Sequence, residues 1–96
     1  MSEVAREKRR GAILKHLTAA KTGELTPEML ASGCTAQGVP TNIDQAVNAA
    51  KWLEGEELAE LVELGGLTLV RILPDGREWV RGVRDLSGIL DPDARG

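Results

Sequence analysis

The chain has 96 residues, of which 42% are hydrophobic and 28% are charged, a balance typical of one folded, soluble domain. Its single cysteine, Cys34, excludes an internal disulfide, and with the single histidine, His16, it leaves too few ligands for a cysteine-rich or histidine-based metal site. No apolar run approaches the roughly 18 residues of a membrane span, and no signal-peptide pattern follows the charged N-terminus. We therefore expect a cytoplasmic protein.

The net charge is −3, but the charges are segregated along the chain. Residues 1–22 hold six basic and two acidic side chains, residues 23–66 hold one basic and eight acidic, and residues 67–96 hold five of each. A basic N-terminal segment suits contact with phosphate, whereas the acidic middle opposes a second such contact.

Two helices are predicted in the first 40 residues. Apolar residues at spacings of three and four predict the first helix over residues 4–20. Thr26 is a suitable N-cap for the second, with Pro27 at its first position. Gly38 and the proline that follows it should end this helix. Its side chains expected to face the core are Met29, Leu30 and Cys34.

A third helix is predicted to begin at Asn42, because this residue and Gln45 three positions later form a capping-box pattern. Gly55 should close it. One apolar stripe along this helix is expected to face the core, and it consists of Ile43, Ala46, Val47, Ala50 and Leu53.

The segments around Gly65-Gly66 favour a β-hairpin, because two short apolar runs flank a turn that requires positive φ angles. Residues 58–64 also match helical spacing, so a continued helix is the alternative. Residues 77–83 fit either a third strand or a short helix. The tail from Asp85 onward is expected to be extended and loosely held.

The spacing of several short motifs resembles that of the small winged helix-turn-helix proteins of Mu-like phages and prophages, which are loosely grouped with ArsR-type regulators. The motifs are Arg6-x-Lys8-Arg9-Arg10-x-x-Ile13-Leu14-x-x-Leu17, Asp44-Gln45, Trp52-Leu53, Leu58, Gly65-Gly66, Gly76, Gly82 and Gly88-Ile89-x-x-Pro92. The resemblance implies an α+β fold, a winged helix-turn-helix with three helices, a two-stranded wing hairpin and a short closing helix at residues 74–82. The winged-helix domain would span residues 1–84, followed by the tail at residues 85–96. Pro74-Asp75-Gly76 differs from the usual Thr-x-x-Gly start of that helix, which leaves the strand alternative open.

The resemblance further implies a phage-encoded, DNA-binding regulator or accessory factor that acts in a bacterial host. We expect it to bind double-stranded DNA as a homodimer that forms through the closing segment. Amide side chains can pair with adenine, a carboxylate can accept from cytosine, and cationic side chains can neutralise phosphates. The candidate DNA-binding residues are Arg6, Lys8, Arg9, Arg10, Asn42, Asp44, Gln45, Asn48 and Lys51. The resembling proteins carry arginines where this chain has Ile43 and Val47, so the commonest guanine-reading side chain is missing from the third helix.

The alternative function is a protein-interaction module that never touches DNA. The apolar closing segment around Trp79 and Leu86 suggests a homodimer interface or a partner site, whereas the two tryptophans also suit a thin core. A continuous positive surface across Arg9, Arg10 and Lys51 would favour DNA, and an exposed apolar patch around Trp79 would favour a partner. We expect no catalytic activity, cofactor or metal, because no catalytic constellation or phosphate-binding loop is present.

Overall fold

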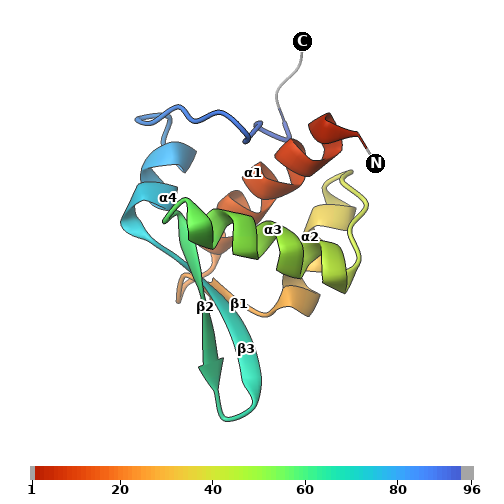
Figure 1. Ribbon diagram of the computed structural model, residues 1–96, viewed down its shortest axis with the longest axis vertical. Helices are drawn as coiled ribbons and strands as arrows, with labels where there is room; N and C mark the ends of the chain where they lie inside the picture. Colours follow the sequence, from red (N-terminus) through yellow and green to blue (C-terminus); the bar gives the residue numbers. More distant parts are fainter. Residues whose placement is uncertain (1, 94–96) are drawn as a thin grey trace.

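Four helices and three strands follow one another along residues 2–93, the part of the chain that this computed structural model describes (Figure 1). In chain order they are α1 (Glu3–Ala19), β1 (Glu24–Leu25), α2 (Pro27–Ala36), α3 (Ile43–Gly55), β2 (Ala59–Leu64), β3 (Leu67–Ile72) and α4 (Pro74–Val80). The fold is α+β, and its antiparallel sheet has the strand order β1-β3-β2.

The starts of α2 and α3 are set by local caps, as predicted. The Thr26 hydroxyl accepts a hydrogen bond from the Met29 N–H at 3.2 Å. At α3 the capping box is complete: Asn42 Oδ1 accepts from the Gln45 N–H at 2.8 Å, and Gln45 Oε1 accepts from the Asn42 N–H at 2.9 Å. These bonds satisfy N–H groups that the first turn of a helix leaves without partners.

The predicted hairpin is confirmed, and β2 pairs with β3 from Ala59↔Ile72 to Leu64↔Leu67. Gly65 and Gly66 form its turn with φ angles of 55° and 82°. The expectation of only two strands is wrong, because the two-residue strand β1 pairs with β3 on its other side. A strand this short carries no detectable alternation, so its sequence gives no signal.

Residues after the hairpin form the closing helix α4, so the strand alternative for residues 77–83 is wrong. Pro74 occupies the first turn, where its missing N–H costs no helical hydrogen bond. Trp79 packs, partly buried, against the core, as does Trp52 on α3. Both tryptophans therefore border the core and keep part of their surface exposed, which lies between the core and the partly exposed interpretations.

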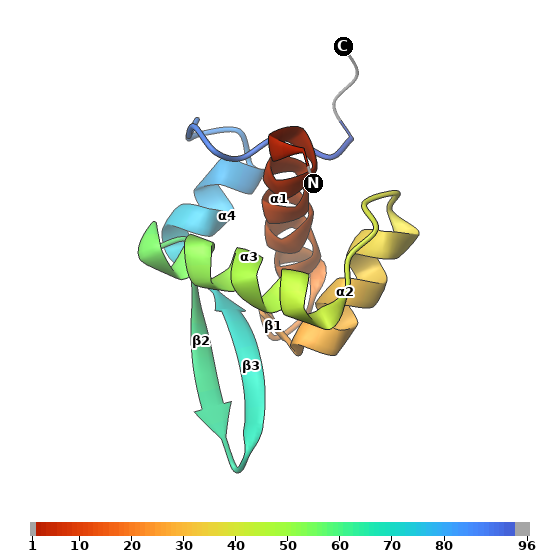
Figure 2. The same ribbon diagram turned by 45° about the vertical axis from the view of Figure 1, so that its right-hand side comes forward.

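The core lies where α1 meets the other elements. Figure 2 shows α3 crossing in front of α1, with α2 and α4 on opposite sides and the hairpin extending away from the helices. The largest fully buried side chains come from five different elements or their connections, and they are Ile13, Leu14, Leu17, Leu30, Cys34, Leu53, Leu58 and Val70.

Two residues that we expected in the core are exposed instead. Met29 is 56% exposed, because α2 turns Leu30, Ala31 and Cys34 inward and Met29 lies about 100° around the helix from Leu30. Ile43 is 47% exposed at the first position of α3, whose buried residues are Ala46, Ala49, Ala50 and Leu53.

The tail does not hang loosely, contrary to expectation. Residues 86–93, which we call the C-terminal strap, run back along α1 (Figure 1). Ile89 is only 5% exposed, and the Leu90 N–H donates to the Glu7 carbonyl at 3.0 Å. Lys15 Nζ lies 2.6 Å from an Asp91 carboxylate oxygen. Residues 94–96 of the predicted tail lie outside the described residues.

The dimer prediction depended on exposed apolar side chains in the closing segment, and the structure places several of these against the core. Leu86 and Val80 are partly buried and pack against the core beside Trp79. In the closing segment only Val83, at 70%, and Leu90, at 38%, are strongly exposed among the large apolar side chains described. Much of the apolar surplus that suggested a homodimer thus packs against the core of the same chain.

Gly11 is the point at which the strap approaches α1 most closely. A Cβ there would overlap the Leu90 carbonyl oxygen and would lie 3.0 Å from a ring carbon of Trp79. Gly55 is also helical, but a Cβ there would meet nothing within 4 Å. The one glycine of α1 is therefore a packing requirement, and Gly55 provides a control for it.

We predict that Gly11→Ala lowers the free energy of unfolding by about 1–3 kcal/mol, because the new methyl group must displace the strap or the helix. Gly55→Ala should change it by less than about 0.5 kcal/mol or stabilise the helix slightly. Urea unfolding followed by tryptophan fluorescence measures both. Equal stability of the two variants would show that the strap does not press on Gly11.

Candidate functional site

Helix α3 has a groove on each side, one that it forms with α1 and one that it forms with the hairpin. We call these two sides of α3 its flanks. Its buried side is made of Ala46, Ala49, Ala50 and Leu53, and Asp44 is exposed on its outer side. Gln45 and Trp52 line a groove shared with α1, whereas Ile43 and Val47 line a groove shared with the hairpin. The groove shared with α1 is lined by arginines, whereas the groove shared with the hairpin is lined by aliphatic side chains and glutamates.

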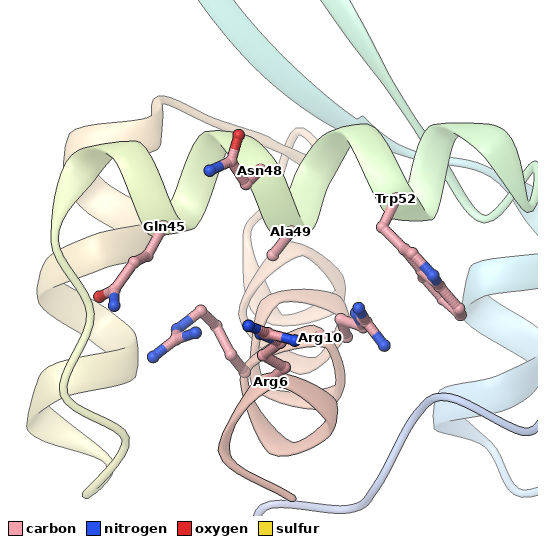
Figure 3. Close-up of a pocket in the computed structure, with 7 residues that line it drawn as sticks. Arg6, Arg10, Gln45, Asn48, Ala49 and Trp52 are labelled. Carbon is pink, nitrogen blue, oxygen red and sulfur yellow. The ribbon is translucent and has the colours of Figure 1, made fainter. Parts of the chain in front are cut away.

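The groove between α1 and α3, which we call the arginine groove, has a volume of about 420 Å³. Figure 3 shows side chains from both helices facing this space. The lining residues are Arg6, Arg9, Arg10, Gln45, Asn48, Ala49 and Trp52. Five of the nine predicted DNA-binding residues are therefore brought together here.

Arg9 is not on the surface where we expected it. The residue is 4% exposed, and its guanidinium donates to Thr41 Oγ1 and to the Pro40 carbonyl, both at 2.9 Å. Burial lowers the pKa of the Arg9 guanidinium. These bonds tie α1 to the loop between α2 and α3, so this cation supports the fold.

Arg10 is also used inside the molecule. Its guanidinium carbon lies 4.1 Å from the centroid of the Trp52 ring, and its Nη1 donates to the Gly88 carbonyl of the strap at 2.8 Å. The Arg10 side chain is 13% exposed and lies 3.7 Å from a Glu3 carboxylate oxygen. Arg6, whose side chain is 53% exposed and 3.4 Å from Glu3, is the accessible cation of this groove.

The other predicted DNA-binding residues lie outside the arginine groove. Asn42 caps α3, Asp44 and Lys8 do not line the groove, and Lys51 lines the groove on the opposite flank. The positive surface that we required across Arg9, Arg10 and Lys51 is therefore not continuous.

The groove between α3 and the hairpin, which we call the hairpin groove, has a volume of about 450 Å³. Its apolar lining comes from four elements, α2, α3, β2 and β3, and consists of Pro27, Ile43, Val47, Leu61 and Leu67. Ile43 is 47% exposed and Leu67 is 51% exposed, so this apolar lining is open to solvent. A second hollow beside it, between α2 and the start of α3, shares Glu28 and Ile43 with it.

Sequence reasoning missed this apolar surface. We assigned Ile43 and Val47 to a core stripe, although their replacement of the arginines found in the resembling proteins was itself a signal. A surface helix that exposes aliphatic side chains and no cations presents an apolar face to solvent.

Carboxylates border the hairpin groove. The elements around it, α2, α3, β2 and β3, carry five acidic side chains against two basic ones, Lys51 and Arg71. Arg71 is already held by Glu24 at 2.9 Å and by Glu60 at 3.2 Å. Glu28 and Glu63 both line the groove and are exposed. The field at this flank is therefore negative.

Cys34 carries the one thiol of the chain. Cys34 is fully buried, and burial raises the pKa of its thiol to about 11. Within residues 2–93 no group of three or more His, Cys, Asp or Glu side chains is placed to hold a metal ion. No helix in the same range is long and apolar enough to cross a membrane.

Comparison with known proteins found no family model, no curated protein and no solved structure that matches this chain. The two grooves beside α3 are therefore the features of this chain that point to a function.

We predict that Cys34 does not react with a thiol-specific reagent at pH 8 in the native protein and reacts fully once urea unfolds it. The folded pKa lies above the ordinary value of 9.0, so the neutral thiol stabilises the fold below pH 9, and this stabilisation is lost as the pH rises towards 11. The absorbance of the thiolate that the reagent releases measures the extent of the reaction. Rapid stoichiometric labelling under native conditions would contradict the burial of this thiol.

Proposed function

We propose that this chain is a winged-helix domain that docks another protein through the hairpin groove. The order α1-β1-α2-α3-β2-β3, with a hairpin that projects beyond the helices, supports the winged-helix assignment (Figure 2). The resemblance to phage winged-helix proteins supports it independently.

The exposed aliphatic lining of the hairpin groove is the observation that carries the docking proposal. Ile43 and Leu67 leave about half of their surface in water, as several other large apolar side chains of this domain do. Ile43 and Leu67, however, line one groove together with Val47 and Leu61. Contiguous exposed apolar surface with a polar rim is typical of protein interaction sites. The cost of leaving these side chains in water is offset when a partner covers them.

Charge argues against DNA on this flank. A duplex that approached α3 and the hairpin together would meet Glu28 and Glu63, and the turn Gly65-Gly66 carries no cation. Phosphates and carboxylates repel each other, and the affinity of DNA-binding proteins depends largely on neutralised phosphates. A protein partner can bury the apolar lining without this opposing term.

We predict that peptides selected from a random library on the immobilised chain bind at the hairpin groove. The double substitution Ile43→Ser with Leu67→Thr should weaken the selected peptides by about tenfold or more, because it removes two apolar contacts. The double substitution Val4→Thr with Val83→Ser, at two other exposed apolar positions, should leave affinity within about twofold. Fluorescence anisotropy of the labelled peptides measures both.

Circular dichroism and urea unfolding confirm that both variants are folded before binding is compared. Failure to select any peptide, or selection of peptides that bind both variants equally, would overturn the docking proposal.

DNA binding is the second candidate, and the arginine groove is the observation that favours it. Arg6 lines this groove with Gln45 of α3, whose amide points into it, while the exposed Asn48 amide points away from α1 (Figure 3). A guanidinium next to an amide group suits contact with a phosphate and a neighbouring base edge. Under this second proposal a duplex would approach the α1 flank of α3, and the chain would act as a phage-encoded regulator or accessory factor.

We predict that any binding to a labelled random duplex is weak, falls steeply with salt, and decreases about threefold in Arg6→Ala, with a salt slope lower by about 0.9. Arg81→Ala, which removes another exposed cation at the end of α4, is the matched control. No binding at low salt, or equal losses in the two variants, would exclude the arginine groove as a DNA site.

A further inference from the structure

We infer that the segment seated in the hairpin groove is a helix with aliphatic anchors flanked by lysine or arginine. This inference rests on the proposed docking function and adds the chemistry of the partner. It follows from three features of the groove: its apolar floor, its carboxylate rim and the way in which the edge of β2 is closed.

The apolar floor requires aliphatic anchors. Val47 and Leu61 are half-buried in the groove, and Ile43 and Leu67 stand beside them with more of their surface exposed. The groove offers little for a polar anchor to bond, because the residues of its floor contribute hydrocarbon. Leucine, isoleucine or methionine side chains of a partner would bury this surface and their own.

The carboxylates at the rim of the hairpin groove favour positively charged residues next to the partner's aliphatic anchors. Glu28 and Glu63 line the groove, are exposed, and form no ion pair among residues 2–93. Lys51 is the one cation in the lining that the structure describes. A partner that brought carboxylates here would add repulsion to the loss of hydration, whereas ammonium or guanidinium groups would complement the rim.

The edge of the sheet favours a helical partner over an added strand. Strand β2 lies at the edge of the sheet, next to β3 only. Its outward-pointing Leu61 N–H already donates to Glu54 Oε2 at 3.0 Å, so α3 closes this position against strand addition. An amphipathic helix needs no backbone hydrogen bonds from its receptor and can fill the groove with side chains alone.

The chain's own surface fits this description poorly. Val83 lies between Arg81 and Arg84 and is 70% exposed, but this segment follows the end of α4 and is not helical. It presents a single aliphatic anchor, so we assign the groove to a different chain.

Three labelled peptides of about 16 residues, or about 24 Å as a helix, test the inference. All carry the same leucine anchors at spacings of three and four, and their flanking positions hold lysine, glutamine or glutamate. At about 0.05 M salt the lysine peptide should bind about fivefold tighter than the glutamine peptide and the glutamate peptide weakest, and these differences should shrink at about 0.5 M salt. Anisotropy titrations measure the affinities.

Two charge-reversal variants assign the effect to the groove. Glu28→Lys should remove most of the preference for the lysine peptide, whereas Asp85→Lys makes the same change of charge at another exposed position and should retain it. Ile43→Ser with Leu67→Thr should weaken all three peptides alike. Circular dichroism of each peptide in the complex should report a gain of helix.

The outcomes separate this inference from the docking proposal. If no peptide depends on Ile43 and Leu67, docking at the groove fails. If all three peptides depend on these residues but bind equally, or if Asp85→Lys acts as strongly as Glu28→Lys, docking stands and the basic partner is wrong. Self-association of the chain that Ile43→Ser with Leu67→Thr abolishes, seen by sedimentation, would assign the groove to a second copy instead.

Discussion

Burial of α1 is the constraint on which the rest of this structure depends. The helix supplies Ile13, Leu14 and Leu17 to the core, and it contacts α2, α3, α4 and β3. The C-terminal strap covers it from a further side, at Gly11. A helix surrounded in this way must find partners inside the molecule for its polar side chains, because the burial of an unpaired charge costs far more than a hydrogen bond returns.

That constraint explains why part of the basic run at residues 6–10 of α1 contacts other segments of the chain and does not face solvent. Arg9 holds the loop between α2 and α3, and Arg10 joins Trp52 to the strap through a cation–π contact and a hydrogen bond. The run therefore resembles a phosphate-binding arm in the sequence, while two of its four cations, Arg9 and Arg10, hold together three segments distant in the chain. Arg6, nearest the end of the helix, is the member left accessible.

The packing of α3 against the core leaves apolar side chains exposed on the side of α3 that faces the hairpin. Small side chains, Ala46, Ala49 and Ala50, bring α3 against the core, and Ile43 and Val47 remain on the flank that faces the hairpin. Glu54 closes the edge of β2 at the Leu61 N–H, beside a groove whose aliphatic side chains are open to solvent. We interpret this combination as a surface suited to side-chain docking that does not invite edge-to-edge pairing of strands.

The sequence by itself determined the features that depend on neighbours within a few residues. The caps at Thr26 and Asn42 and the hairpin at Gly65-Gly66 agree with the structure because their hydrogen bonds and φ angles are local. Only the tertiary structure decided that β1 joins β3, that Ile43 faces solvent, that Arg9 is buried, and that the strap packs on α1 through Ile89. The Arg9 contact spans 32 residues and the contact between Arg10 and Gly88 spans 78, and no periodicity or composition along the chain encodes which distant segment will cover a side chain.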